Sequence, residues 1–132
     1  MPFPNNVKPN IISRASKDLV DSNGINGRVG HVTEDGRDLI ARIERYGTRT
    51  GLCCENTDYG NSKAIDIVRS FIIDDGRKLM NYTYPSLHIL VPSRSHRNNL
   101  VSISYEVAGI SIGQHVTHKW CTCVTLATGI II

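Results

Sequence analysis

Candidate metal ligands are concentrated near the C-terminal end of the chain, in the sequence His115-x-x-His118-x-x-Cys121-x-Cys123. Imidazole and thiolate groups are the usual ligands of Zn²⁺, so this cluster raises the question of a zinc site. The segment also has the pattern of a β-strand, on which His115 and Cys121 would lie about 20 Å apart and His118 would point to the opposite face. A tetrahedral site needs all its donors around one ion, so we expect neither a bound metal nor a cofactor.

Two His-x-Thr triplets, which begin at His31 and His115, are the second chemical pattern. They resemble the motifs of the 2H phosphoesterase superfamily, which includes RNA ligase-like and cyclic-phosphodiesterase enzymes. The resemblance implies that His31 and His115 face each other across a groove as general base and general acid, while Thr33 and Thr117 hold the phosphate. Imidazole suits such chemistry because it titrates near neutral pH. Two unrelated surface histidines are the competing interpretation.

Positive charge gathers in the second half of the chain. Residues 76–132 contain five Lys and Arg against one acidic residue, whereas residues 1–75 contain ten against eleven. Arg94 and Arg97 fall in a polar stretch with amide side chains, which can hold phosphate groups through charge-assisted hydrogen bonds. We therefore predict that an anionic partner such as nucleic acid contacts Arg94, Arg97 and Lys119. A solvated hairpin tip is the competing interpretation.

The N-terminal part of the chain has few clear elements. Residues 1–16, with three prolines, predict an extended arm that precedes a single domain over residues 17–132, and residues 22–30, with three glycines, predict a loop. The segment over residues 33–47 is ambiguous. Asp35-Gly36 favours a two-residue hairpin turn, whereas Leu39, Ile43 and Tyr46 form a helical stripe that ends at a glycine. We favour the helix.

The remaining segments predict the fold class. Residues 61–73 place apolar side chains at the spacing of an amphipathic helix. Alternating apolar residues then predict strands over four ranges, which are residues 87–91, 100–107, 110–112 and 115–126. We expect an α+β fold in which one or two helices of the N-terminal half pack on a C-terminal antiparallel meander of about four strands.

Length and composition limit the class of protein. A chain of 132 residues suits one domain, and 40% hydrophobic with 20% charged residues argues against global disorder. The N-terminus does not resemble a signal peptide, and no apolar run is long enough to cross a membrane, so a cytoplasmic protein with reduced cysteines is expected.

The C-terminal residues Ile130–Ile132 are unusually apolar for the end of a chain. They suit an edge strand or an insertion into a neighbouring subunit. Together with the basic second half, they predict a non-enzymatic, self-associating structural or binding protein of the coat, shell or matrix kind, such as a homo-oligomeric viral protein inside a virion. A 2H-type phosphodiesterase acting on RNA or a cyclic phosphate is the alternative.

Overall fold

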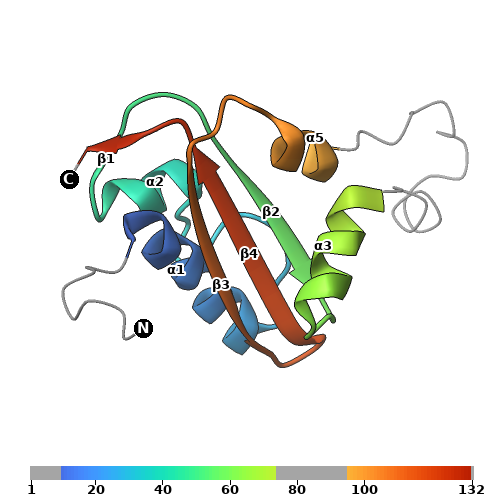
Figure 1. Cartoon of the computed structure of the whole chain (residues 1–132). Coiled ribbons are helices and arrows are strands. Elements are labelled where there is room, and N and C mark those ends of the chain that lie inside the picture. The colour runs from blue at the N-terminus through green and yellow to red at the C-terminus, as the bar shows by residue number, and fades with distance from the viewer. Residues whose placement is uncertain (1–9, 74–94, 132) are drawn as a thin grey trace, which may run out of the picture.

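The computed structural model describes residues 10–73 and 95–131. A three-stranded antiparallel sheet lies at its centre, with α1 and α2 on one face and α3 and α5 on the other (Figure 1). The helices are α1 (Ile11–Asn26), α2 (Leu39–Glu44), α3 (Ala64–Ile73) and α5 (Ser95–Val101). The strands are β1 (Thr48–Arg49), β2 (Cys53–Tyr59), β3 (Val107–His115), β4 (Lys119–Ala127) and β5 (Ile130–Ile131). The α+β prediction is confirmed, with helices packed on an antiparallel sheet.

Helix α1 occupies sequence that was expected to be partly arm and partly loop. The side chain of Asn10 caps its first turn by accepting from the backbone N–H of Ile12 at 3.0 Å, and Gly27 ends it in the left-handed conformation. Its buried residues recur at helical spacing: Ile12, Ala15, Ser16, Leu19, Val20 and Asn23. Residues 11–16 of the predicted arm and 22–26 of the predicted loop are therefore helical, and residues 1–9 lie outside the described part of the chain.

In the ambiguous segment the structure has a tight turn without flanking strands, in place of a two-residue hairpin, and then a helix shorter than the one we favoured. The turn comprises Glu34, Asp35 and Gly36, since the backbone N–H of Gly36 donates to the carbonyl of Thr33 at 2.9 Å and the N–H of Thr33 donates to the carbonyl of Arg37 at 3.0 Å. Asp38 then caps the short helix α2 by accepting from the N–H of Ala41 at 2.9 Å. Helix α2 then places Leu39 and Ile43 against the core, while Ile40 is exposed.

The sheet order is β2-β4-β3, and its two faces differ in character. Gly109 on β3 faces α1 so closely that a Cβ atom there would lie 2.3 Å from the backbone of Ile12. Because side chains alternate along a strand, the neighbouring Ile110 and Ile112 point to the opposite face and remain about half exposed. Gly109 and Gly113, which flank the predicted strand over residues 110–112, are internal to β3, where their lack of a side chain lets α1 approach.

Several predicted strands differ from the observed ones. Residues 95–101 form α5 and β3 begins only at Val107, so the predicted strand over residues 100–107 is wrong. Ile103, which was expected to pack on a sheet face, is 99% exposed. Strand β2 was not predicted, and the predicted strand over residues 87–91 lies outside the described residues. Helix α3 and strand β4 appear close to where their patterns placed them.

The apolar C-terminal segment forms an edge strand, one of the two predicted outcomes. Ile130 and Ile131 pair antiparallel with β1, and Ile130 packs against the core cluster around Ile12 and Ile43. Among the described helices, none is long and apolar enough to cross a membrane.

Candidate ligand-binding cleft at His31 and Glu55

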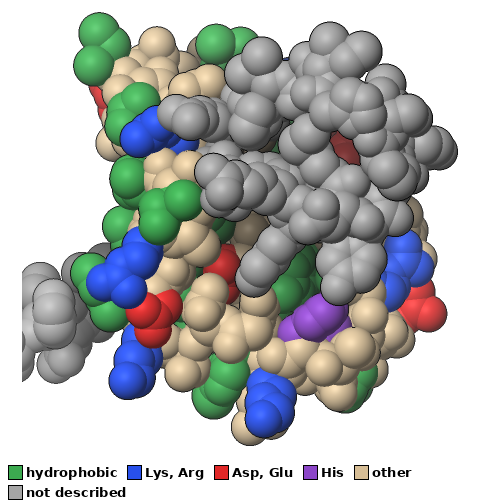
Figure 2. Space-filling view, turned by 90° about the vertical axis from the view of Figure 1, so that its right-hand side faces the viewer, with side chains coloured by type: hydrophobic (Ala, Val, Ile, Leu, Met, Phe, Trp, Pro, Cys, Tyr) green, Lys and Arg blue, Asp and Glu red, His purple; other side chains and the backbone are tan. Residues whose placement is uncertain are grey.

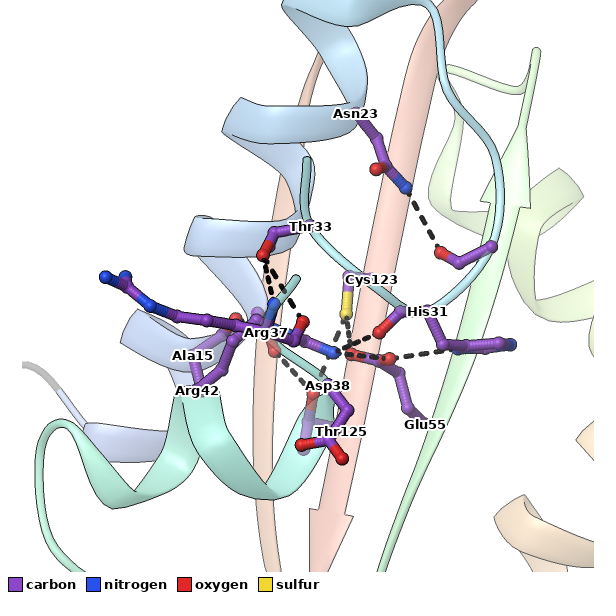
Figure 3. A network of polar contacts seen from close by, with 12 residues as sticks. Ala15, Asn23, His31, Thr33, Arg37, Asp38, Arg42, Glu55, Cys123 and Thr125 are labelled. Carbon is purple, nitrogen blue, oxygen red and sulfur yellow. Dashed lines mark hydrogen bonds and ion pairs between the residues drawn. The ribbon is translucent and has the colours of Figure 1, made fainter. Parts of the chain in front are cut away.

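A buried ion pair lies beneath the loop that follows α1. Arg42 projects from α2 and is fully buried, and its Nη2 donates to Glu55 Oε2 on β2 at 2.8 Å. Nη1 donates to the carbonyl of Ala15 at 2.8 Å and Nη2 also donates to the carbonyl of His31 at 3.2 Å, while Nε is buried without a partner. One guanidinium group therefore ties α1, the following loop and β2 together (Figure 3).

His31 is held by the same carboxylate. Its Nδ1 lies 2.9 Å from Glu55 Oε2, and its ring extends away from α1 (Figure 3). A neutral imidazole that donates from Nδ1 to a carboxylate has an acceptor lone pair at Nε2. Half of the side chain is exposed, so this second nitrogen is accessible from the cleft that His31 lines.

Glu55 is ionised despite its burial. Burial raises the pKa of a carboxyl group, but the hydrogen bonds from His31 and Arg42 outweigh that effect and hold the pKa of Glu55 below its ordinary value of 4.5. Its other oxygen, Oε1, accepts from the thiol of Cys123 at 2.9 Å. Thr125 Oγ1 lies 3.6 Å from that sulfur and accepts from the hydroxyl of Ser16 at 2.8 Å, which continues the network to α1.

The cleft above this network has a volume of about 290 Å³. Its described lining residues come from the loop after α1, from α2, β2 and α5, and they are His31, Leu39, Cys54, Glu55, Ser95, His96 and Asn99. Asn99 donates from Nδ2 to Asn56 Oδ1 at 2.9 Å, and Asn56 donates from Nδ2 to the carbonyl of His96 at 2.9 Å. The amide of Asn99 is therefore oriented with its oxygen, Oδ1, left as a further acceptor.

The structure does not bring the two His-x-Thr triplets together. His115 is 2% exposed, its Nε2 lies 2.8 Å from the carbonyl of Arg28, and its Nδ1 accepts from the backbone N–H groups of Thr117 and His118. Both of its nitrogens are thus engaged with backbone groups, Nδ1 in its own turn and Nε2 in the loop after α1. His115 and His31 also line different cavities. The hydroxyl of Thr33 donates to Asp35 in the turn before α2.

The three predicted contacts with an anionic partner do not form one described surface. Arg94 lies outside the described residues. Arg97 is on α5, and Lys119 begins β4 at the tight β3–β4 turn, where its φ is +72°. Figure 1 places α5 and this turn toward opposite ends of the sheet.

Sequence reasoning selected His31 but missed the residues that position it. Arg42 follows Leu39 by three positions and precedes Ile43, so it falls on the apolar stripe of α2. A charged residue on such a stripe needs a buried partner of opposite charge, and this signal could have directed attention to Glu55. His96 and Asn99 had been assigned to a loop, whereas α5 presents both to the cleft.

Comparisons with known proteins identify a structural neighbour but no family. No protein-family model matches the chain, and no curated protein has a similar sequence. An outer surface protein from Borrelia burgdorferi has a similar structure, with a TM-score of 0.64 and 16% sequence identity over 93% of this chain and 77% of that one. At this identity the likeness concerns the fold, so the chain shares its architecture with a bacterial outer surface protein.

Proposed function

We propose that the protein is a binding domain and that the cleft at His31 takes a small ligand rich in hydrogen-bond donors, such as an amine or a polyol. The observation that carries the proposal is the orientation of His31 by the buried Glu55, at 2.9 Å. A side chain fixed in this way presents its remaining nitrogen without first losing rotamer freedom, which lowers the entropic cost of binding.

The chemistry of the cleft favours donors over acceptors. When Nδ1 of His31 donates to Glu55, the Nε2 atom of the neutral ring is an acceptor. When Nδ2 of Asn99 donates to Asn56, the Oδ1 atom of Asn99 is an acceptor as well. Glu55 and Arg42 compensate each other in charge beneath them, at 2.8 Å. A ligand with two or more N–H or O–H groups would satisfy both acceptors, whereas a ligand with acceptors alone would satisfy neither.

The cysteines favour binding over nucleophilic catalysis. Burial raises the pKa of Cys53, Cys54 and Cys123, and it raises the pKa of Cys121 to about 11. The thiolate is the reactive form of cysteine, and a raised pKa keeps the thiol protonated near neutral pH. Cys54, which lines the cleft, therefore suits a packing role.

The proposal is tested by NMR titration of the full chain with ethanolamine, glycerol and acetate, observing the imidazole signals of the histidines. We expect saturable shifts of the His31 signals with the two donor-rich probes and none with acetate. In His31→Ala, affinity for the donor-rich probes should fall at least about 5-fold, the equivalent of one hydrogen bond. His118→Ala, at an exposed histidine outside the cleft, is the control. Equal binding of acetate, or unchanged affinity in His31→Ala, would refute the proposal.

Self-association in a coat-like or matrix-like layer is the second candidate function. The observation that favours it is an apolar surface on the side away from α1, where Val68, Ile110 and Ile112 lie around one cavity and are each about half exposed. Sedimentation of the chain at increasing concentration tests this function, and a monomer throughout would exclude it. Contact of an anionic partner such as nucleic acid with Arg94, Arg97 and Lys119 stays a prediction from the sequence, and its test is whether binding to RNA or DNA weakens as the salt concentration rises.

A further inference from the structure

A second cavity lies on the other face of the sheet, between α3 and the strands β3 and β4. Its volume is about 380 Å³, which falls within the range of small-molecule pockets. Hydrophobic side chains supply most of the lining, among them Ile67 and Phe71 of α3, Leu100 of α5, and Ile112 and Val124 of the sheet. On the side that carries α3 and α5, Figure 2 shows hydrophobic side chains reaching the surface.

One polar group in this lining has no partner. Thr122 of β4 lines the cavity, is 3% exposed, and its hydroxyl oxygen makes no hydrogen bond. Its cross-strand neighbour on β2 is Asp58, which accepts from Asn61 at 3.1 Å and from Ser70 at 2.8 Å through one oxygen only. The other carboxylate oxygen of Asp58 is buried and unpartnered as well. Directly paired residues share a face, so both unpartnered atoms lie on this side of the sheet.

Buried polar atoms without partners are rare in folded proteins and costly to keep. The unpartnered hydroxyl of a residue that lines an apolar cavity carries a free-energy cost, and a bound molecule can reduce that cost if it brings a polar group to the same place. The apolar walls determine the rest of the molecule, since they bind aliphatic or aromatic groups and reject charged ones.

We propose that this cavity binds a neutral apolar molecule with a terminal hydroxyl group, such as an aliphatic alcohol, whose O–H meets Thr122. A ligand hydroxyl can accept from the Thr122 hydroxyl or donate to it. A carboxylate in the same position would be repelled by Asp58 and would lose its hydration. This site is separate from the cleft at His31 and takes a ligand of the opposite character, so it extends the proposed function.

Titration of the full chain with 1-octanol, followed by calorimetry and by backbone NMR shifts, tests the proposal, with octanoate as the charged counterpart. We expect saturable octanol binding that shifts signals of Thr122 and Ile112, and octanoate binding at least about 10-fold weaker. Thr122→Val keeps the shape and removes the hydroxyl, so octanol affinity should fall about 5-fold, as for one lost hydrogen bond. No octanol binding, or equal binding of octanoate, would overturn the proposal.

Two tryptophan variants of α3 locate the site. Val68 lines the cavity and is 50% exposed, so Val68→Trp should fill the space and reduce octanol binding at least about 10-fold. Ile65, on the same helix and 61% exposed, lies outside the lining, and Ile65→Trp should leave octanol binding unchanged. Full affinity in Val68→Trp would place the alcohol elsewhere and overturn the assignment, whether or not Thr122→Val had weakened binding.

Discussion

On the face of the sheet that α1 covers, a guanidinium, a carboxylate, a thiol and two hydroxyls are buried together and joined by hydrogen bonds. On the opposite face, the hydroxyl of Thr122 and one carboxylate oxygen of Asp58 are also buried, but they have no partner, and Thr122 lines an apolar cavity. The first arrangement fixes the positions of α1, α2 and β2 relative to one another, and it orients His31. The second arrangement leaves polar atoms without hydrogen bonds, and a ligand could supply the missing partner. Burial of polar groups can therefore serve rigidity in one place and binding in another.

The largest effect should follow removal of Arg42. Arg42→Ala leaves the Glu55 carboxylate buried without its cation, which we expect to lower the free energy of unfolding by about 3–5 kcal/mol. Urea unfolding measures the change. Arg69→Ala, which removes an arginine 62% exposed in its side chain, should change the value by less than about 0.5 kcal/mol. If both variants were equally stable, the inner network would not be the rigid region.

Gly109→Ala should have the next largest effect. The new Cβ would approach the backbone of Ile12 and Ser13 to 2.3 Å, so α1 would have to move away from the sheet. Overpacking of this kind costs about 1–3 kcal/mol. Thermal unfolding provides the measurement. Gly36→Ala is the control for loss of a glycine without crowding, because no atom lies within 4 Å of a Cβ there, although its φ of +87° adds backbone strain. Retention of full stability in Gly109→Ala would show that α1 is free to shift.

A matched pair of threonines compares the two faces directly. Thr125→Val on the inner face removes a partner of Ser16 and Cys123, so the free energy of unfolding should fall by about 1–2 kcal/mol. Thr122→Val on the outer face removes a hydroxyl that has no partner, and the free energy of unfolding should stay equal or rise. Chemical denaturation of both variants in parallel is the measurement. A reversed order would show that the hydroxyl of Thr122 has a stabilising contact.

The smallest effect should be a change in how steeply the free energy of unfolding depends on pH when Glu55 is replaced. The folded-state pKa of Glu55 is lowered, so ionised Glu55 contributes stability above its unfolded-state pKa, near 4.5, and this stability is lost as the pH falls through the folded-state pKa. In Glu55→Gln that contribution is absent at every pH. The free energy of unfolding should therefore fall less steeply in the variant than in the wild type as the pH is lowered below about 4.5. Parallel slopes would mean that Glu55 is not ionised in the fold.

Elements defined by local side-chain patterns were predictable, and elements defined by distant partners were not. The stripe from Ala64 to Ile73 predicts α3 because its apolar residues share one helical face. Helix α1 was missed because its buried stripe includes Asn23 and Gly24, which are poor helix formers. These two residues are required by contacts with later parts of the chain. Asn23 donates to the carbonyl of Gly30 and to the hydroxyl of Tyr59, and Gly24 allows the carbonyl of Gln114 to approach.

The alternation over residues 100–107 was a misleading signal for the same reason. A period of two shows which residues could share a face, but a strand also needs a neighbouring strand, which the pattern does not name. The residues of the candidate site were also hard to predict, because they are brought together by distant parts of the chain. His31 was selected because it resembled one half of a pair with His115, but its observed partner is Glu55. Glu55 belongs to β2, a strand that no side-chain pattern predicted, and Arg42 was overlooked on the apolar stripe of α2.

Helix α1 precedes the sheet in the sequence yet depends on its last strands. Ser16 hydrogen-bonds to Thr125, a separation of 109 residues, and Asn10 donates to the carbonyl of Ala108. During synthesis the helix therefore leaves the ribosome long before β3 and β4 exist to bury its apolar stripe. Folding dominated by such distant contacts is slow. The apolar stripe of α1 stays exposed until the strands form, and exposed apolar surface is prone to aggregate. A chain with such long-range contacts should therefore depend on chaperones for folding more than its small size suggests.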